Sequence, residues 1–200
     1  IQTWVALPKS HEEQDPTFQH YPADVLPRIK SGDATGVLIS GSAYGHTSPV
    51  EFPAGICQLV LATDVYTTIE TPAAPELCLY VVSGRAQIGE LEVKEATMAI
   101  LAPGATPRVK LDAGTRIMFA GGAPLDGPRF IDWNFVASSK ERLAKAAADW
   151  RASIAGDFQN TWFTQPTGET HWIPLPGDPQ PPGVDHIPDD HDDDHPDWKS

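Results

Sequence analysis

The central part of the chain alternates short apolar segments with gaps that contain glycine or proline. In residues 77–125, LCLYVVSGRAQIGELEVKEATMAILAPGATPRVKLDAGTRIMFAGGAPL, an apolar or alternating segment recurs about every eight to twelve residues. Glycines interrupt the windows that are long enough to hold an amphipathic helix. The pattern therefore predicts an antiparallel β-sandwich or barrel with meander or Greek-key connections.

The same alternation predicts where the individual strands lie. Residues 1–35 are expected to form a first strand, IQTWVAL, and then a polar surface strap. The β-branched segment 56–70 predicts two strands separated at Thr63-Asp64. The apolar residues expected to anchor the strap are Phe18, Tyr21, Val25, Leu26 and Ile29. Further strands are expected at 36–40, 77–82, 85–88, 90–93, 97–101, 108–111 and 116–120. The Gly121-Gly122 pair is expected to end that series, and a final strand is expected at 130–135. Loops are expected at 41–50 and 71–75.

One segment has helical periodicity, at about 139–155. Ser138 and Glu141 have the spacing of a capping box, with Ser138 as the N-cap, and Gly156 suits a helix stop. The residues expected on one apolar face are Leu143, Ala146, Ala147, Trp150 and Ile154. We expect this helix to lie over the sandwich or across a domain boundary, with its aromatic side chain used for packing.

Charge is concentrated at the end of the chain. The net charge is −13, and residues 174–200 contribute −7 through eight Asp and one Lys. Residues 177–200 are rich in Pro, Asp and His and have too little apolar material to offset ordering entropy, so a disordered tail is predicted. The rest of the chain is moderately acidic and offers no basic stripe, which argues against direct nucleic-acid binding.

Composition excludes several other classes of protein. There is no apolar run of 18 residues, so no transmembrane helix is predicted and no membrane partner is expected. The first residues lack the pattern of a secretory signal, which favours the cytoplasm. Because the chain starts without Met, we expect that it begins inside a longer protein. Cys57 and Cys78 stand in apolar runs and are expected to be buried, reduced thiols.

Two stretches resemble the metal-binding motifs of cupin barrels but lack the ligands. In cupins the first motif is His-x-His, then Glu, then six residues and Gly; counting back from Gly84 gives Leu77, and Glu76 would point to the other face. Glu70-Thr71-Pro72 occupies the His-x-His region. In the second motif, around Pro103-Gly104, Thr106 and Pro107 stand where a histidine is expected. With no histidine between Thr47 and Thr170, we expect no imidazole metal centre in this barrel.

The remaining polar residues predict no catalytic group. His11 and His20 are expected to be solvated, His46 could line a rim, and His171 is expected to pack beside Trp172. The tail histidines could chelate a cation weakly but are expected to be solvated: His186, His191 and His195. Ser138 and Ser139 belong to helix capping, without a G-x-S-x-G motif, and Gly121-Gly122 opens no helix and so forms no phosphate loop.

Three stretches taken together resemble the pirin family. They are FQHYPADVLP leading to GSAYGHTSPV, then LYVVSGRAQIG, and then GGAPLDGPRFIDWNFVASSKERLAKAAADW with WIPLP after it. Pirins are bicupins, so the resemblance implies an all-β, cupin-type (RmlC-like) jelly-roll sandwich or barrel with one C-terminal α-helix. It also implies that residues 1–35 include the end of a preceding cupin, that 36–176 form the C-terminal cupin, and that 177–200 are a tail.

The same resemblance sets the functional expectations. Pirin-like proteins hold iron in the N-terminal cupin through three His and one Glu, so none of those ligands is assigned to this chain. We expect this chain to carry no cofactor of its own and to pack against a metal-bearing N-terminal cupin, present as a domain or as a second chain. The alternatives are a quercetin 2,3-dioxygenase-like metal-dependent oxidoreductase when the chain is joined to that domain, and a regulatory module that binds another protein, with the Asp/His tail as the contact.

Overall fold

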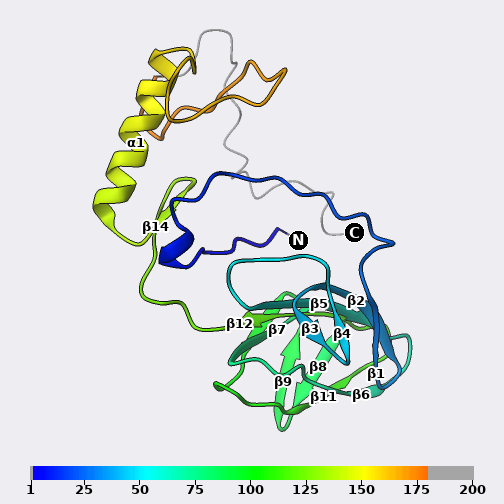
Figure 1. Cartoon of the computed structure of the whole chain (residues 1–200). Coiled ribbons are helices and arrows are strands. Elements are labelled where there is room, and N and C mark those ends of the chain that lie inside the picture. Colours follow the sequence, from blue (N-terminus) through cyan, green and yellow to red (C-terminus); the bar gives the residue numbers. More distant parts are fainter. Residues whose placement is uncertain (1, 180–200) are drawn as a thin grey trace, which may run out of the picture. The chain divides into compact units, whose positions relative to one another are not determined.

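The computed structural model describes residues 2–179, which form two compact units, residues 2–128 and residues 129–179. Each unit is described by itself. The first is built of strands and the second contains the single long helix, α1 (Figure 1). No helix in the described part of the chain is long and apolar enough to cross a membrane. Most of the predicted tail, from 180 onward, lies outside the described residues.

The first unit is built around two antiparallel sheets. The larger has the strand order β1-β2-β5-β12-β7-β10 and the smaller has the order β6-β11-β8-β9. The strands of the larger sheet are β1 (Arg28–Ser31), β2 (Ala34–Ser40), β5 (Ile56–Ala62), β7 (Glu76–Ser83), β10 (Thr97–Ile100) and β12 (Arg116–Gly122). Those of the smaller sheet are β6 (Thr67–Glu70), β8 (Arg85–Ile88), β9 (Leu91–Lys94) and β11 (Arg108–Leu111). The predicted class, antiparallel strands followed by one C-terminal helix, is confirmed.

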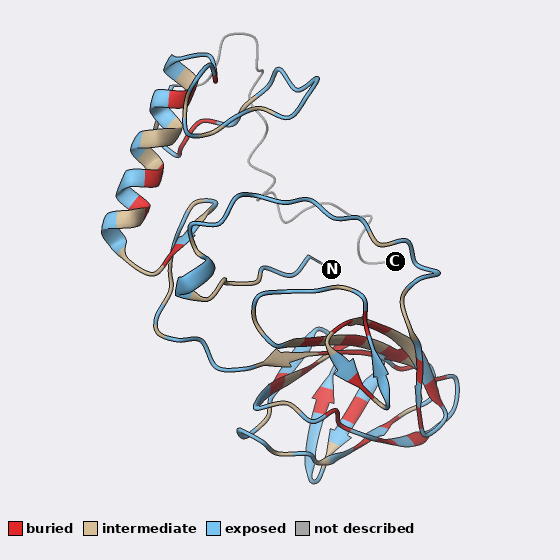
Figure 2. Cartoon of the chain, in the orientation of Figure 1, coloured by how far each residue is buried: buried red, intermediate tan, exposed pale blue. Residues whose placement is uncertain are grey.

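The core lies between the two sheets. Leu79, Phe119, Leu59 and Leu38 are register neighbours across four strands of the larger sheet, and all four are fully buried. Ile69, Val109 and Leu111 face them from the smaller sheet and are also buried. Buried and exposed residues alternate along most strands, as Figure 2 shows, because successive side chains of a strand point to opposite faces. This alternation is the signal that predicted most strands correctly.

Two hairpins were missed, because at least one strand of each has only two to four residues. β1 contains one apolar residue, Ile29, and turns into β2 through Gly32, whose φ is +58°. A Cβ on Gly32 would lie 2.5 Å from the carbonyl oxygen of Thr68, so only glycine fits this turn. β3 (Ser42–Ala43) and β4 (His46–Thr47) form the other hairpin, inside the stretch expected to be a loop.

Three other expectations are wrong. Residues 2–7 form no strand, and Phe18 and Val25 do not anchor the strap, since Phe18 is 93% exposed and Val25 is 48% exposed. The strand expected at 130–135 is a hairpin, β13 (Phe130–Asp132) and β14 (Phe135–Ala137), which turns at Trp133 with φ 49°. β12 is two residues longer than the predicted 116–120 and ends at the Gly121-Gly122 pair, as expected. An added Cβ on Gly121 would lie 2.0 Å from the carbonyl oxygen of Glu76, so glycine lets the neighbouring strand approach.

The helix of the second unit is α1 (Lys140–Ala155), and its N-cap is one residue later than predicted. Ser139 has extended backbone angles, and its side chain accepts a hydrogen bond from the backbone N–H of Arg142 at 3.2 Å. Because Glu141 is then only two residues past the cap, it does not complete a capping box. The C-cap is Gly156, as expected, although its φ of −92° lies outside the left-handed region.

An aromatic cluster holds α1 to the rest of its unit. The ring of Trp150 lies 5.2–5.7 Å, centroid to centroid, from the rings of Phe163, Phe158 and Trp133. Its indole N–H also donates to the carbonyl oxygen of Ile173 at 3.0 Å. A ring in contact with three others at these spacings contributes beyond the area that it buries. The expectation that Trp150 packs rather than forms a site agrees with these contacts.

We predict that Trp150→Ala destabilises the second unit by about 3 kcal/mol or more, because it removes a large packed side chain. Trp150→Phe keeps a ring in the cluster but loses the hydrogen bond to Ile173, so it should destabilise the unit by about 1 kcal/mol. A larger loss would mean that packing in the cluster is also disturbed. Urea unfolding of the full chain, followed by far-UV circular dichroism of the helix, measures both variants. An unchanged helix transition in Trp150→Ala would show that the cluster does not hold α1.

Candidate functional site

Two open pockets lie beside the β3–β4 hairpin, and both are in the first unit. One has a volume of about 500 Å³ and is lined by the hairpin and by residues 70–73 at the end of β6. The other, of about 430 Å³, is lined by residues of β1 and β2. His46 belongs to the lining of both pockets. His46 is therefore the one residue that the two linings have in common.

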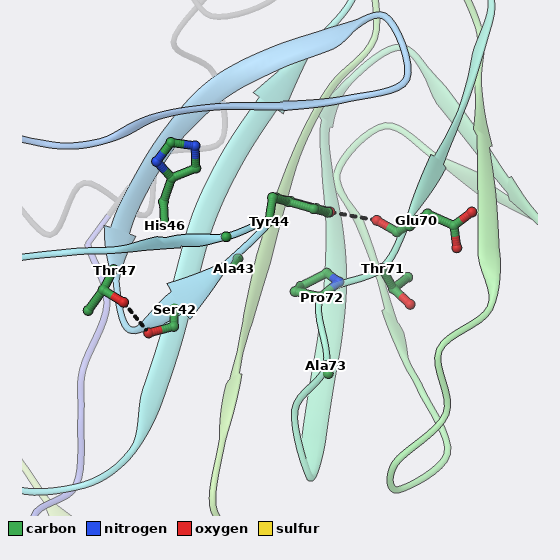
Figure 3. Close-up of a pocket in the computed structure, with 10 residues that line it drawn as sticks. Ser42, Ala43, Tyr44, His46, Thr47, Glu70, Thr71, Pro72 and Ala73 are labelled. Carbon is green, nitrogen blue, oxygen red and sulfur yellow. Dashed lines mark hydrogen bonds between the residues drawn. The ribbon is translucent and has the colours of Figure 1, made fainter.

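The tight turn of the hairpin sets the position of Tyr44. Tyr44 and Gly45 have φ values of 51° and 80°, the two left-handed residues of a two-residue hairpin turn. Below the turn, the hydroxyls of Ser42 and Thr47 lie 2.9 Å apart across the strands. The figure shows the Tyr44 ring extending from the turn toward Glu70, while the ring of His46 points away from the Ser42–Thr47 pair (Figure 3).

Tyr44 joins the hairpin to the end of β6. Its hydroxyl donates a hydrogen bond to the backbone carbonyl oxygen of Glu70 at 2.5 Å, and its ring packs against the core. Burial raises the pKa of Tyr44 to about 12; a hydrogen bond with Ser31 opposes this shift, and the charges of Cys57 and Glu70 add to it. The side chain is therefore a neutral phenol at physiological pH.

Two buried hydroxyls lie near the same end of the barrel without a partner. Among the described residues, the side-chain oxygens of Ser40 and Thr71 make no hydrogen bond, although both residues are more than nine-tenths buried. Thr71 also lines the larger pocket. A buried hydroxyl without a partner is unfavourable, so each gains free energy from a polar atom placed beside it.

The positions that match the cupin metal motifs do not suit a metal. Leu77 is buried and Glu76 is exposed, as predicted from strand alternation. At the other motif positions, Thr71 is buried, Thr106 is exposed and Pro107 is half-buried. A first-row metal needs imidazole, carboxylate or thiolate ligands, which leucine, threonine and proline do not supply. Residues 2–179 contain no group of three or more His, Cys, Asp or Glu side chains arranged for a metal, and the expected lack of a cofactor in this chain stays a prediction.

Most histidines lie apart from these pockets. His11 and His20 are exposed, as expected. His171 is exposed rather than packed, with Nδ1 3.3 Å from Glu169 Oε1. Two backbone N–H groups, of His171 and of Thr170, bind the Glu169 carboxylate and lower its pKa, so this turn is explained by local hydrogen bonds. The three tail histidines lie outside the described residues.

The cysteines do not form a reactive pair. Cys57 is buried and Cys78 is half-buried, and both are free. Burial raises the pKa of each thiol, so neither is activated toward thiolate chemistry.

Sequence reasoning missed two residues of the smaller pocket, Arg28 and Lys30. They flank the buried Ile29, so they point to the same side of β1. The signal was the short alternation Arg-Ile-Lys, which we had placed in an irregular strap.

We predict that Tyr44→Phe changes how stability responds to high pH. Since the pKa of Tyr44 is about 12 in the folded chain and near 10 when unfolded, its contribution is complete below pH 10 and is lost as pH rises from 10 to 12. The variant also loses the hydrogen bond to Glu70, about 1 kcal/mol at pH 7. Urea midpoints at pH 7, 10 and 11 measure both effects, with the exposed Tyr66→Phe as the control. An equal decline with pH in the Tyr44 variant and the unchanged chain would contradict the assignment.

Comparison with known proteins matches this chain to one family. Residues 56–156 match the Pirin C-terminal cupin domain. The chain is 41% identical over 155 residues to a Pirin-like protein of Caulobacter vibrioides, which covers 76% of this chain and 53% of that protein. It is 25% identical over 171 residues to Pirin of Rattus norvegicus, which covers 81% of this chain and 59% of that protein. The chain thus spans between about half and three-fifths of the length of these curated relatives.

A solved structure supports the same fold. The crystal structure of Quercetin 2,3-dioxygenase from Acinetobacter baumannii matches 85% of this chain and 59% of its own chain, with a TM-score of 0.69 and 25% sequence identity. The two antiparallel sheets and the C-terminal helix are consistent with the fold of this structure and with the family match. This chain belongs to the pirin family, and its residues 56–156 are the family's C-terminal cupin domain.

Proposed function

We propose that this chain is the C-terminal cupin half of a pirin-like protein, without a metal site of its own, which packs against a metal-bearing N-terminal cupin and helps to shape that site. The observation that carries the proposal is the outer face of the six-stranded sheet. The central rows of that face are apolar, although the core already covers the inner face of the same sheet.

The register defines the apolar outer face. One row crosses five strands: Met98, Tyr80, Met118, Val60 and Val37. The next row holds Ile100, Cys78, Ala120 and Gln58. The only charged side chain in these two rows is Arg28, which follows Val37 on the edge strand β1, and Ile100 is 84% exposed. Sheets that face water on one side normally place polar residues there, so this composition favours a covering partner.

The four-stranded sheet provides the contrast. Its outer face pairs Arg108 with Glu70 at 2.7 Å, and Arg85 with Asp112 at 2.6 Å and with Glu92 at 3.2 Å. Such exposed ion pairs add little stability but keep a surface hydrated. The two outer faces therefore differ in kind: one suits water and the other suits contact with protein.

The first residues of the chain already lie on part of the apolar face. Gln58 Nε2 donates to Thr3 Oγ1 at 2.9 Å and lies 3.5 Å from the sulfur of Met118. Met98 and Ile100, near the β10 edge, remain more than half exposed. A partner that continues this cover would bury the rest of the sheet.

The partner's chemistry is inferred from the family. In the proposed assembly, iron or another divalent metal is held by the N-terminal cupin, and this chain supplies one wall of the site. The dioxygenase named among the solved structures makes quercetin 2,3-dioxygenase-like oxidation the activity to test first in such an assembly. A regulatory module that binds another protein is the second candidate, because an apolar sheet face suits such a partner as well.

We predict that Met98→Glu/Ile100→Glu blocks assembly with an N-terminal cupin. The probe is the half of the Caulobacter vibrioides Pirin-like protein that this chain does not match, mixed with the full chain and followed by analytical ultracentrifugation. Charges placed on a face that must be desolvated should weaken association about tenfold or more. Thr68→Glu/Lys110→Glu, on the outer face of the other sheet, is the matched control and should associate normally. Failure of the unchanged chain to associate, or equal association of both variants, would reject the proposal.

We also predict that metal in the assembly resides outside this chain. Metal analysis of the purified chain should find well below one equivalent of iron, because the motif positions lack ligands. The same analysis on His186→Asn/His191→Asn/His195→Asn removes weak chelation by the tail. One equivalent of iron retained by that variant would overturn the metal-free assignment.

A further inference from the structure

We propose that the β3–β4 hairpin is a lid over the seam between the two sheets, latched by Tyr44, and that it opens locally while the rest of the first unit stays folded. The lid is residues 42–47. Its opening lets water reach three inner groups: the hydroxyls of Ser40 and Thr71 and the thiol of Cys57. The inference concerns the first unit alone and does not depend on the proposed packing against another cupin.

The closed lid is held at its base and at its tip. At the base, Ser48 Oγ donates to the carbonyl oxygen of Ile39 on β2, in the larger sheet, at 2.7 Å. At the tip, the Tyr44 hydroxyl donates to the carbonyl oxygen of Glu70 on β6, in the smaller sheet (Figure 3). In the described part of the chain, this is the one hydrogen bond that ties the lid to the smaller sheet. Glu70 is itself fixed, because its N–H donates to Ser31 Oγ at 3.1 Å. The tip therefore has a single latch on a rigid acceptor.

The lid contributes little to the core. Ala43 is buried and Tyr44 is half-buried, and both pack against the core cluster. The 2.9 Å contact between the two hydroxyls of its strands lies inside the lid and survives opening. A segment that buries few apolar side chains opens at a lower free energy than the whole domain unfolds. The other four residues of the lid are exposed: Ser42, Gly45, His46 and Thr47.

Two buried hydroxyls oppose closure. Ser40 is the last residue of β2, just before the lid, and Thr71 directly follows Glu70, which accepts the Tyr44 bond. Both side-chain oxygens are buried and have no hydrogen-bond partner among the described residues. A buried hydroxyl without a partner costs free energy that hydration returns. Water admitted by opening would satisfy both groups, which favours the open lid.

Cys57 reports on the lid. Its sulfur lies 3.9 Å from the carbonyl oxygen of Ser42 in β3, and the residue is buried. The other thiol, Cys78, is half-buried and donates to the carbonyl oxygen of Ala120 at 3.2 Å. Serine can make the same bond, so the C78S chain carries one thiol, next to the lid. A thiol reagent reaches Cys57 only when the lid opens or the domain unfolds.

A simpler explanation is that the hairpin is a fixed connection between β2 and β5. In that case Cys57 reacts only through global unfolding. The two explanations differ in their response to urea, because global unfolding exposes a large area and is strongly favoured by urea, whereas opening of a short hairpin exposes little and responds weakly.

The test measures the reaction of the full-length C78S chain with 5,5′-dithiobis(2-nitrobenzoate) at several urea concentrations below the unfolding transition. We expect the rate to depend little on urea and to exceed the rate that the global unfolding equilibrium allows. The Y44F variant in the same background should react about fivefold faster in this range, because it loses the latch. The Y66F variant, whose ring is exposed and outside the lid, is the control and should react at the unchanged rate. A rate that follows global unfolding, or equal rates in Y44F and Y66F, would overturn the proposal.

A second pair of variants tests the two hydroxyls. S40A/T71V removes both buried groups, so opening no longer gains their hydration, and Cys57 should react about fivefold more slowly or less. T68V, which changes an exposed hydroxyl of β6, is the matched control and should react at the unchanged rate. An unchanged or faster reaction in S40A/T71V would reject the part of these hydroxyls in opening the lid.

Discussion

The burial of the inner face of the six-stranded sheet against the four-stranded sheet is the interaction on which the rest of this fold depends. Its inner face presents the row Leu79, Phe119, Leu59 and Leu38, which the smaller sheet buries completely. Its outer face carries two further rows that are mainly apolar. Burial of apolar area is the main favourable term in folding and in association, which is the physical basis of the proposed contact with a second cupin.

The smaller sheet is apolar on its inner face only. Its inner residues complete the core, while its outer residues form ion pairs across the strands. This difference orients the domain: contact with protein is expected on the side of the large sheet, and water on the side of the small one. The proposed assembly with a second cupin is consistent with that orientation and with a chain that spans about half the length of the Caulobacter vibrioides relative.

The positions that match the cupin metal motifs carry hydroxyl and apolar side chains in this chain. Thr71, Leu77 and Pro107 occupy motif positions, and Tyr44 closes the same region through its bond to Glu70. Hydroxyl and apolar groups cannot hold a cation there, but they can bind neutral parts of an organic molecule.

Local pattern determined a large part of this fold. The alternation of 56–62, 85–88 and 108–111 predicted those strands, and the spacing of apolar residues after Ser139 predicted the helix, because strand and helix periods act over a few residues. The empty motif positions, including inward Leu77 and outward Glu76, also followed from sequence. Short elements did not: β1, β3 and β4 have two to four residues each, too few for a period to show. Only the tertiary structure decided the place of His46 in both pockets, the hydrogen bond from Tyr44 to Glu70 and the place of Arg28 and Lys30 beside His46. Each depends on segments distant in the chain that the sheet register brings together.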